Sequence, residues 1–192
     1  MKSIVAIIFT SFAVVLCTSS QGLSVNAGIT VLNLFPTNAI TTIEFSHCGK
    51  AGSKQFVEVD KDAKMIYWEW KNKNTDTCCF GIRIPNPNLV PFHKEHSLKI
   101  VWNKNAVYDK TKPPQVKFVS LDKTNSAQVL VGDNYSINTN SKEVEVFRIP
   151  ISDFYSRAGK AMENVEFLQF DAKYESVNGV IEIVEIGIEK DN

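Results

Sequence analysis

Residues 97–102 read Ser-Leu-Lys-Ile-Val-Trp, and this alternation decides the fold class. On an extended strand, neighbouring side chains point to opposite faces of the sheet, so Leu98, Ile100 and Trp102 share one face. The run 115–118 reads Gln-Val-Lys-Phe and repeats the pattern. Such alternation predicts antiparallel strands with one face packed and the other partly wet.

Similar runs recur along the chain, and polar or Pro- and Gly-containing breaks separate them. We predict strands at 29–34, 42–45, 55–59, 65–70, 79–84, 97–102, 115–121, 128–131, 143–149, 165–171 and 180–188. Pro113-Pro114 lies between two of these runs, as expected because proline has no donor for a central strand. Asn178-Gly179 is the strongest hairpin signal. About ten strands without a long helix predict an all-β, two-sheet antiparallel β-sandwich.

The first residues have the three zones of a secretory signal peptide. Lys2 is basic, residues 4–17 are apolar, and residues 18–22 read Thr-Ser-Ser-Gln-Gly. The apolar run is shorter than the roughly 20 residues of a spanning helix, which disfavours an uncleaved membrane anchor. We expect cleavage after Gly22, with Ser20 as the alternative, and a single secreted, extracellular domain over residues 23–192. We expect no contact with the membrane after cleavage.

Composition and motifs limit the function classes. Acidic and basic residues balance at 21 each, which gives no reason to expect nucleic acid as a partner. There is no Gly-x-Ser-x-Gly nucleophile elbow. Carboxylate pairs such as Glu143 with Glu145, or Glu182 with Glu185, are typical of outer strand faces rather than of a glycosidase pair. We therefore expect no enzyme activity and no cofactor.

The cysteines and histidines predict a disulfide rather than a metal site. Cys17 would leave with the signal, so Cys48, Cys78 and Cys79 remain. In an exported chain, the simplest arrangement is one disulfide from Cys48 to Cys78 or Cys79. Only one of these neighbours can readily face Cys48. We take Cys78 as the partner and keep Cys79 as the alternative. The three histidines lack metal-ligand spacing (His47, His93 and His96).

One N-glycosylation acceptor is present, Asn134-Tyr135-Ser136. It follows Val131-Gly132-Asp133, which is typical of a turn. We therefore expect Asn134 to be exposed and available for a glycan.

The C-terminal half has an ordered series of strand-edge phrases. They are residues 97–102, 115–122, 146–154 (Val-Phe-Arg-Ile-Pro-Ile-Ser-Asp-Phe), 164–170 (Asn-Val-Glu-Phe-Leu-Gln-Phe) and 179–188. Over roughly residues 64–189, this order resembles the jelly-roll carbohydrate-binding modules of the galactose-binding-domain-like group. The resemblance implies a jelly-roll sandwich and a carbohydrate ligand, although the same scaffold hosts other functions. Two departures are Glu185, where the group usually has Asp, and the Cys78-Cys79 pair.

Sugar binding in water needs flat apolar platforms together with fixed polar groups. Trp68 and Trp70 are two residues apart, so both rings emerge from one strand face about 7 Å apart and form the candidate platform. The alternative is that both rings pack inside the sandwich. The polar candidates lie on neighbouring strand runs and are Lys99, Lys117, Gln169 and Asp171. The alternation of their runs directs Lys99 and Lys117 away from the core.

These observations predict a secreted, non-catalytic domain that recognises a polysaccharide or glycan through aromatic stacking. Two alternatives stay open. One is a secreted, lipocalin-like carrier of a small apolar ligand, and the other is a structural protein of an extracellular matrix or coat. Exposed rings at Trp68 and Trp70 would favour the first function, and an internal hollow lined by Phe and Val would favour the carrier. The sequence indicates no particular protein partner.

Overall fold

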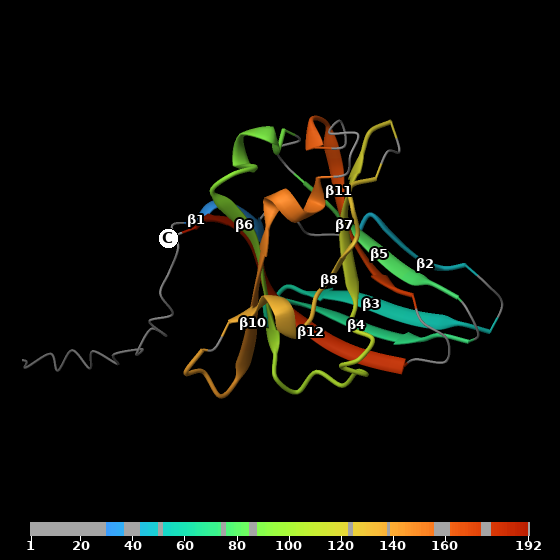
Figure 1. Cartoon of the computed structure of the whole chain (residues 1–192). Helices are drawn as coiled ribbons and strands as arrows, with labels where there is room; N and C mark the ends of the chain where they lie inside the picture. Colours follow the sequence, from blue (N-terminus) through green and yellow to red (C-terminus); the bar gives the residue numbers. More distant parts are fainter. Residues whose placement is uncertain are drawn as a thin grey trace, which may run out of the picture.

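The computed structural model describes residues 30–36, 43–49, 52–73, 76–84, 88–122, 125–137, 139–155, 162–173 and 178–191. Regular structure in these segments is almost entirely β-strand, arranged in two packed sheets (Figure 1). Among the described segments, short 3₁₀ turns that connect strands include η1 (Val90–Phe92), η2 (Asp133–Tyr135) and η3 (Ile151–Phe154). No helix of the described segments is long and apolar enough to cross a membrane. The predicted signal peptide, residues 1–22, lies outside them.

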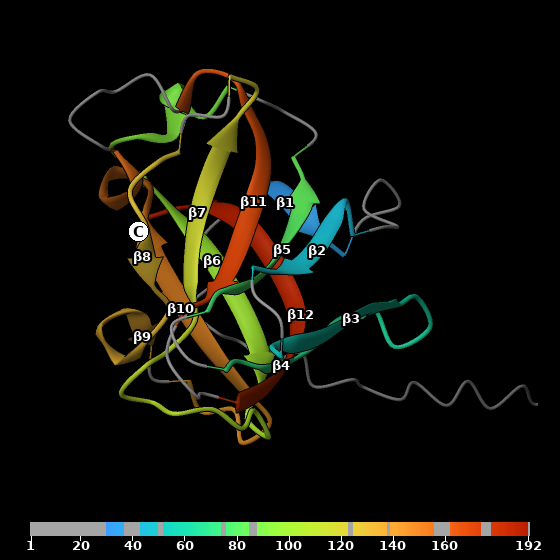
Figure 2. The ribbon, with the colours of Figure 1, turned by 90° about the vertical axis from the view of Figure 1, so that its right-hand side faces the viewer.

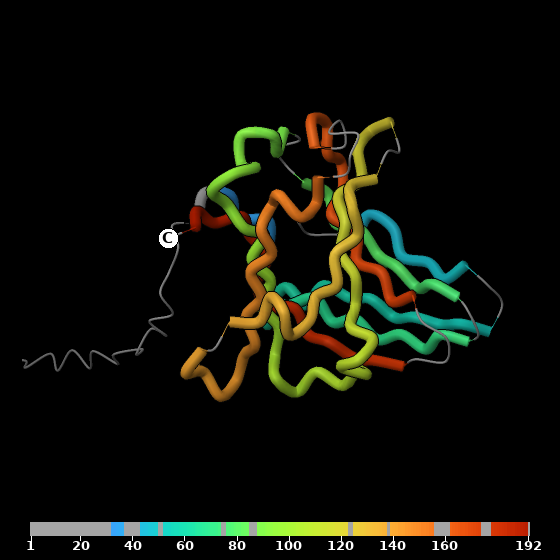
Figure 3. Tube along the Cα trace, viewed as in Figure 1, coloured from blue at the N-terminus to red at the C-terminus, as the bar shows by residue number. Residues whose placement is uncertain are grey.

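Sheet A has seven strands and is organised around the longest one. Its order is β3 (Lys54–Asp60), β4 (Met65–Lys71), β12 (Asn178–Lys190), β6 (His96–Asn103), β10 (Val144–Pro150) and β9 (Ser136–Ile137), and β1 (Thr30–Phe35) also pairs with β12. The first half of β12 pairs with β4, and its second half lies between β6 and β1. Figure 3 shows how this late strand lies beside the early strand β4. One 13-residue strand thus joins both halves of the chain.

Sheet B has five strands in the order β2 (Phe45–Cys48), β5 (Cys78–Arg83), β11 (Val165–Ala172), β7 (Gln115–Ser120) and β8 (Val129–Leu130). Figure 2 shows these strands side by side. All their pairings are antiparallel. Together with sheet A they form the two-sheet antiparallel β-sandwich that the alternation predicted.

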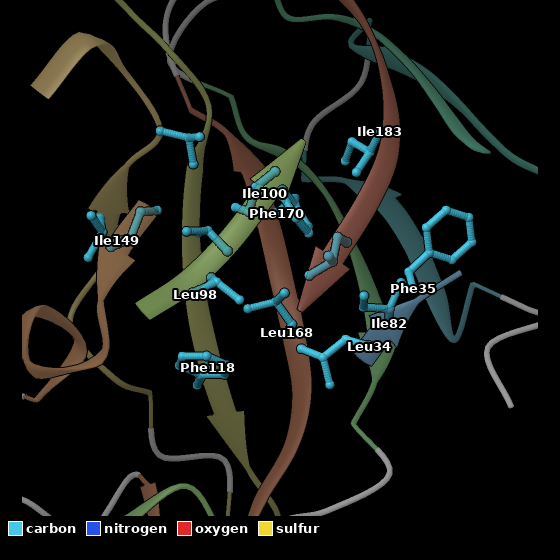
Figure 4. Close-up of a cluster of buried hydrophobic side chains, with 14 of the residues drawn as sticks. Leu34, Phe35, Ile82, Leu98, Ile100, Phe118, Ile149, Leu168, Phe170 and Ile183 are labelled. Atoms are coloured by element: carbon cyan, nitrogen blue, oxygen red, sulfur yellow. The ribbon is translucent and has the colours of Figure 1, made fainter. Parts of the chain in front are cut away.

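The core lies between the sheets and follows the predicted parity. Leu98 and Ile100 of β6 are fully buried, as are Leu168 and Phe170 of β11 (Figure 4). Trp102 continues the buried row of β6, as expected. Because each strand turns alternate residues inward, its remaining residues form the outer faces of the sandwich.

Two local predictions are wrong in position. The predicted strand 42–45 overlaps the observed β2 only at Phe45, because the pairing of β2 with β5 runs from Phe45 to Cys48. The predicted hairpin turn at Asn178-Gly179 is instead the start of β12. Any Cβ at position 179 would overlap the ring of Trp70. Glycine is therefore needed here, because the indole of Trp70 packs directly against the backbone.

Aromatic rings fill one end of the core, and the tryptophans of β4 belong to them. Trp68 and Trp70 are 0% and 2% exposed, and their ring centroids lie 4.4 Å apart. Trp68 also packs edge-on against Phe80 and Phe170 of sheet B. Its Nε1 donates to Gln55 Oε1 over 3.1 Å. The structure therefore corrects the prediction of an exposed stacking platform at Trp68 and Trp70, because burying these rings between the sheets leaves no face for a sugar.

Replacing Trp68 by alanine should lower the free energy of unfolding by about 3–5 kcal/mol, because the change leaves a cavity between the sheets. Urea unfolding measures this effect. Leu121→Ala is the control, since Leu121 is 59% exposed and its loss should change stability by less than about 0.5 kcal/mol. Equal stability of the two variants would contradict the core position of Trp68.

Candidate functional site

The outer face of sheet B brings together three of the predicted polar residues. Gln169 and Asp171 lie on β11, the central strand, and Lys117 lies on β7 directly opposite Gln169. Lys99 does not join them. It lies on β6 of sheet A, where its Nζ is 2.9 Å from Glu185 Oε1. The grouping of Lys99 with the other three is therefore wrong, because the chain crosses from sheet A to sheet B between β6 and β7.

Asp171 organises the polar groups of this face. Its residue is only 1% exposed, although it lies on the outer side of the sheet. Gln169 Nε2 donates to Oδ1 over 2.6 Å, and Gln128 Nε2 donates to Oδ2 over 2.7 Å. Lys117 Nζ lies 3.5 Å from Oδ2 and forms an ion pair. A buried carboxylate needs such partners, so the two amides and the ammonium are held in fixed positions.

Aromatic side chains lie next to this network. Phe45 of β2 is half-buried, and its ring fills the space above Gly81, where any Cβ would overlap it. Gly81 pairs with Gln169, so the ring of Phe45 and the amide of Gln169 belong to one row across the sheet. Phe167 packs edge-on against Phe45 at 5.5 Å, and exposed His47 lies 5.9 Å from it on the other side. We call Phe45, His47, Lys117, Gln128, Phe167, Gln169 and Asp171 the sheet B face.

The three cysteines of the described segments lie on both sides of sheet B, with Cys48 and Cys78 on the core side and Cys79 on the side of the sheet B face. Cys48 and Cys78 are bonded, which confirms the predicted pair, and the bond joins β2 to β5. Cys79 is a buried free thiol, with Sγ 3.5 Å from His47 Nε2. Burial, with a further contribution from the charge of Asp171, raises the pKa of Cys79 to about 11. Cys79 therefore stays a neutral thiol near neutral pH. No cluster of three or more potential metal ligands occurs in the described segments.

A hollow of about 630 Å³ borders the sheet B face. Its lining includes Gln128, just before β8, Leu130 of β8, Tyr135 of η2 and Asp153 of η3. The hydroxyl of Tyr135 donates to Asp153 Oδ2 over 2.8 Å. Asn134 is exposed and lies on the lining of the hollow, so the predicted glycan acceptor is accessible. Gln128 belongs to both regions, which makes the hollow a continuation of the face.

Sequence reasoning missed Phe45, His47, Gln128 and Phe167. The predicted strand 42–45 ended before His47, so the run of β2 along β5 went unrecognised. Phe167 could have been predicted, because it points to the same side of β11 as Gln169 and Asp171. Gln128 lies just before the two-residue strand β8, and no periodic signal marks so short an element.

The sequence matches no protein-family model and no curated protein. Solved structures match in fold. A family 30 carbohydrate-binding module of a cellulosomal cellulase of Clostridium thermocellum has a TM-score of 0.58 at 12% identity, over 83% of this chain and 97% of the module. A family 11 module of the same organism, in complex with a β-1,3-1,4-mixed-linked tetrasaccharide, has a TM-score of 0.51 at 10% identity, over 84% of this chain and 97% of that one.

A β-1,2-glucanase from Parabacteroides distasonis has a TM-score of 0.59 at 11% identity. The match covers 83% of this chain and only 25% of the glucanase chain. At such identities the likeness is one of fold. It confirms the jelly-roll β-sandwich that the C-terminal phrases predicted, and the chain has the fold of carbohydrate-binding modules of families 11 and 30.

Removing the carboxylate of Asp171 should destabilise the protein. Asp171→Ala leaves the mostly buried Lys117 without its ion-pair partner and should lower the free energy of unfolding by about 3 kcal/mol. The double variant Asp171→Ala/Lys117→Met removes both charges and should recover part of this loss. Glu95→Ala is the control, because its side chain is 69% exposed in a surface ion pair. Urea unfolding of the four proteins tests the network, and a single variant as stable as the control would contradict it.

Proposed function

We propose that the chain is a secreted, non-catalytic domain whose sheet B face binds a polysaccharide or glycan. One observation carries the proposal: an accessible aromatic ring, Phe45, shares a row with the fixed polar groups of Gln169 and Lys117. Sugars offer an apolar ring face and a rim of hydroxyls, and this row offers partners for both. The fold shared with carbohydrate-binding modules supports the same function.

Each group has a defined role in the proposed complex. The exposed part of Phe45 stacks on a sugar ring, and the neighbouring Phe167 holds Phe45 in place. The amides of Gln169 and Gln128 and the ammonium of Lys117 donate to hydroxyls. Asp171 acts as a positioning residue, because it already orders these donors in the free protein. Groups ordered before binding lose less entropy when the ligand arrives.

The other functions receive less support from the packing. The space between the sheets is filled by large side chains, among them Trp68, Phe80, Phe118 and Phe147, whereas a carrier needs room there. The carboxylates considered for catalysis have structural partners, since Glu145 accepts from Trp102 Nε1 and Glu185 pairs with Lys99. The packing does not decide against a matrix or coat protein without a sugar ligand. The binding test below distinguishes that function from sugar binding.

Export is the second part of the proposal, and it rests on the signal-like residues 1–22 and on the disulfide. Expressed with its own N-terminus in a secreting host, the chain should appear in the medium with Leu23 as its first residue. N-terminal sequencing and intact mass measure this, and the mass also reports a glycan on Asn134, with Asn134→Gln as the control. Retention of residues 1–22 on the exported chain, or of the chain inside the cell, would contradict the proposal.

Binding is tested by pull-down of the purified chain with insoluble cellulose, chitin, mannan and xylan, and by affinity electrophoresis in mixed-linked β-glucan. We expect binding to at least one of them. Phe45→Ala and Gln169→Ala should each weaken it about tenfold, which corresponds to about 1.4 kcal/mol. Val107→Ala is the control, because Val107 is 67% exposed and bridges to β12 of sheet A, away from the sheet B face.

Circular dichroism checks that each variant keeps its fold. Gln169→Ala keeps the test decisive if Phe45→Ala unfolds, since Gln169 contributes no core side chain. Absence of binding to every polysaccharide would overturn the sugar proposal and favour the matrix protein. Binding that neither variant changes would place the site elsewhere.

A further inference from the structure

The outer face of sheet A has an aromatic pair that lies apart from the sheet B face, and it consists of exposed Phe56 and half-buried Tyr67. Phe56 of β3 is 53% exposed. Its ring lies 6.0 Å from the ring of Tyr67 on β4, at an interplanar angle of 60°. With Met65 they contribute to the lining of a hollow of about 380 Å³. Hollows of this size accommodate small ligands, and large apolar side chains in them supply the contact area.

Carboxylates lie opposite both rings. Tyr67 lies directly opposite Glu58 of β3 on one side and Glu182 of β12 on the other. Phe56 lies directly opposite Glu69. Side chains in directly opposite positions have Cβ atoms only about 5 Å apart, so Glu58 and Glu69, which both line the hollow, lie within reach of a group held over the rings.

These carboxylates have few partners in the described segments. Glu58 and Glu69 form no ion pair there, and Glu69 accepts only from the hydroxyl of Tyr67, over 3.3 Å. Glu182 accepts from the side-chain amides of Asn103 and Asn105, at 2.7 and 3.2 Å. Partial burial raises the pKa of Tyr67, and the nearby negative charges of Glu69 and Glu182 raise it further.

Asp60 also lines the hollow, but its role is structural. Its Oδ1 accepts from the backbone N–H groups of Asp62 and Ala63 and closes the turn between β3 and β4. This turn holds the two aromatic strands in register. The site therefore consists of Phe56, Glu58, Tyr67 and Glu69, and Glu182 lies next to it on β12.

We propose that this hollow binds a protonated amino sugar, as a unit of a glucosamine oligomer. The faces of Phe56 and Tyr67 attract a cation and also stack on a pyranose ring. Glu58 and Glu69 supply the negative charge that an ammonium group requires, and Glu182 adds to the negative charge beside the hollow. A neutral sugar would leave these carboxylates without a cation. A lysine side chain would bring the charge without a sugar ring to stack on the exposed ring of Phe56.

The test compares two oligomers by isothermal titration calorimetry at low salt, at a pH where the free amine is protonated. The glucosamine tetramer should bind, and the N-acetylglucosamine tetramer, which has the same backbone without the charge, should bind at least tenfold more weakly. High salt should weaken the first interaction, because partly exposed charges are screened.

Three variants locate the site. Glu58→Gln keeps the size of the side chain and removes its charge, and Tyr67→Ala removes one ring; each should weaken glucosamine binding at least tenfold. Leu121→Ala should bind as the unchanged chain does. Glu58→Gln also keeps the test decisive if Tyr67→Ala fails to fold by circular dichroism.

Three outcomes would overturn the proposal. They are no binding of the glucosamine tetramer, equal binding of the N-acetylated tetramer, and equal or tighter binding of a tri-lysine peptide. The last would identify the hollow as a site for basic peptides. The first and third outcomes do not bear on the sheet B face, whose test uses other residues and neutral polysaccharides. Binding of the N-acetylated tetramer counts against the proposal only if Phe45→Ala leaves it unchanged, because that variant weakens binding at the sheet B face.

Discussion

Each strand of the sandwich must turn every second side chain toward a core shared by two sheets, and this requirement fixes what the outer faces can present. On β4, burial of Trp68 and Trp70 places Tyr67 and Glu69 outside. On β11, burial of Leu168 and Phe170 places Gln169 and Asp171 outside. The same alternation that removes the tryptophans from any binding site thus creates two outer surfaces with distinct chemistry.

The sheet B face depends on two interactions that hold its parts together. The first is the buried charge of Asp171, whose partners on β7, on β11 and before β8 join three neighbouring segments. The second is the Cys48–Cys78 bond, which fixes the four-residue edge strand β2. In the loop-entropy model, a bond that closes a loop of this length stabilises by about 3–4 kcal/mol. Since β2 contributes Phe45 and His47, the bond also fixes the aromatic part of the face.

Local periodicity was sufficient to predict the fold and part of the site. Lys117 could be identified as an outward residue, because strand parity depends only on neighbours in the sequence. Lys99 shares that parity, yet it lies on the other sheet, and no local pattern states which strands form one sheet. Gln169 and Asp171 were candidates by residue type, since their strand is apolar on both sides and its parity does not decide which face is outside. Parity likewise placed Trp68 and Trp70 on one face of β4 without deciding which face, and their large apolar area decided it in favour of the core.

The two outer faces differ in how their charged side chains are paired. Each face therefore suits a ligand of different charge. On the sheet B face, the carboxylate of Asp171 already has an ammonium partner in Lys117 and two amide donors. Its remaining groups therefore offer hydrogen bonds with little net charge, which suits neutral hydroxyls. On sheet A, Glu58 and Glu69 have no cationic partner among the described residues. Binding a cation there relieves the repulsion between neighbouring carboxylates, whereas binding a neutral sugar leaves that repulsion in place. The ligands proposed for the two faces therefore differ in charge, because the two sheets expose opposite sides of a common core.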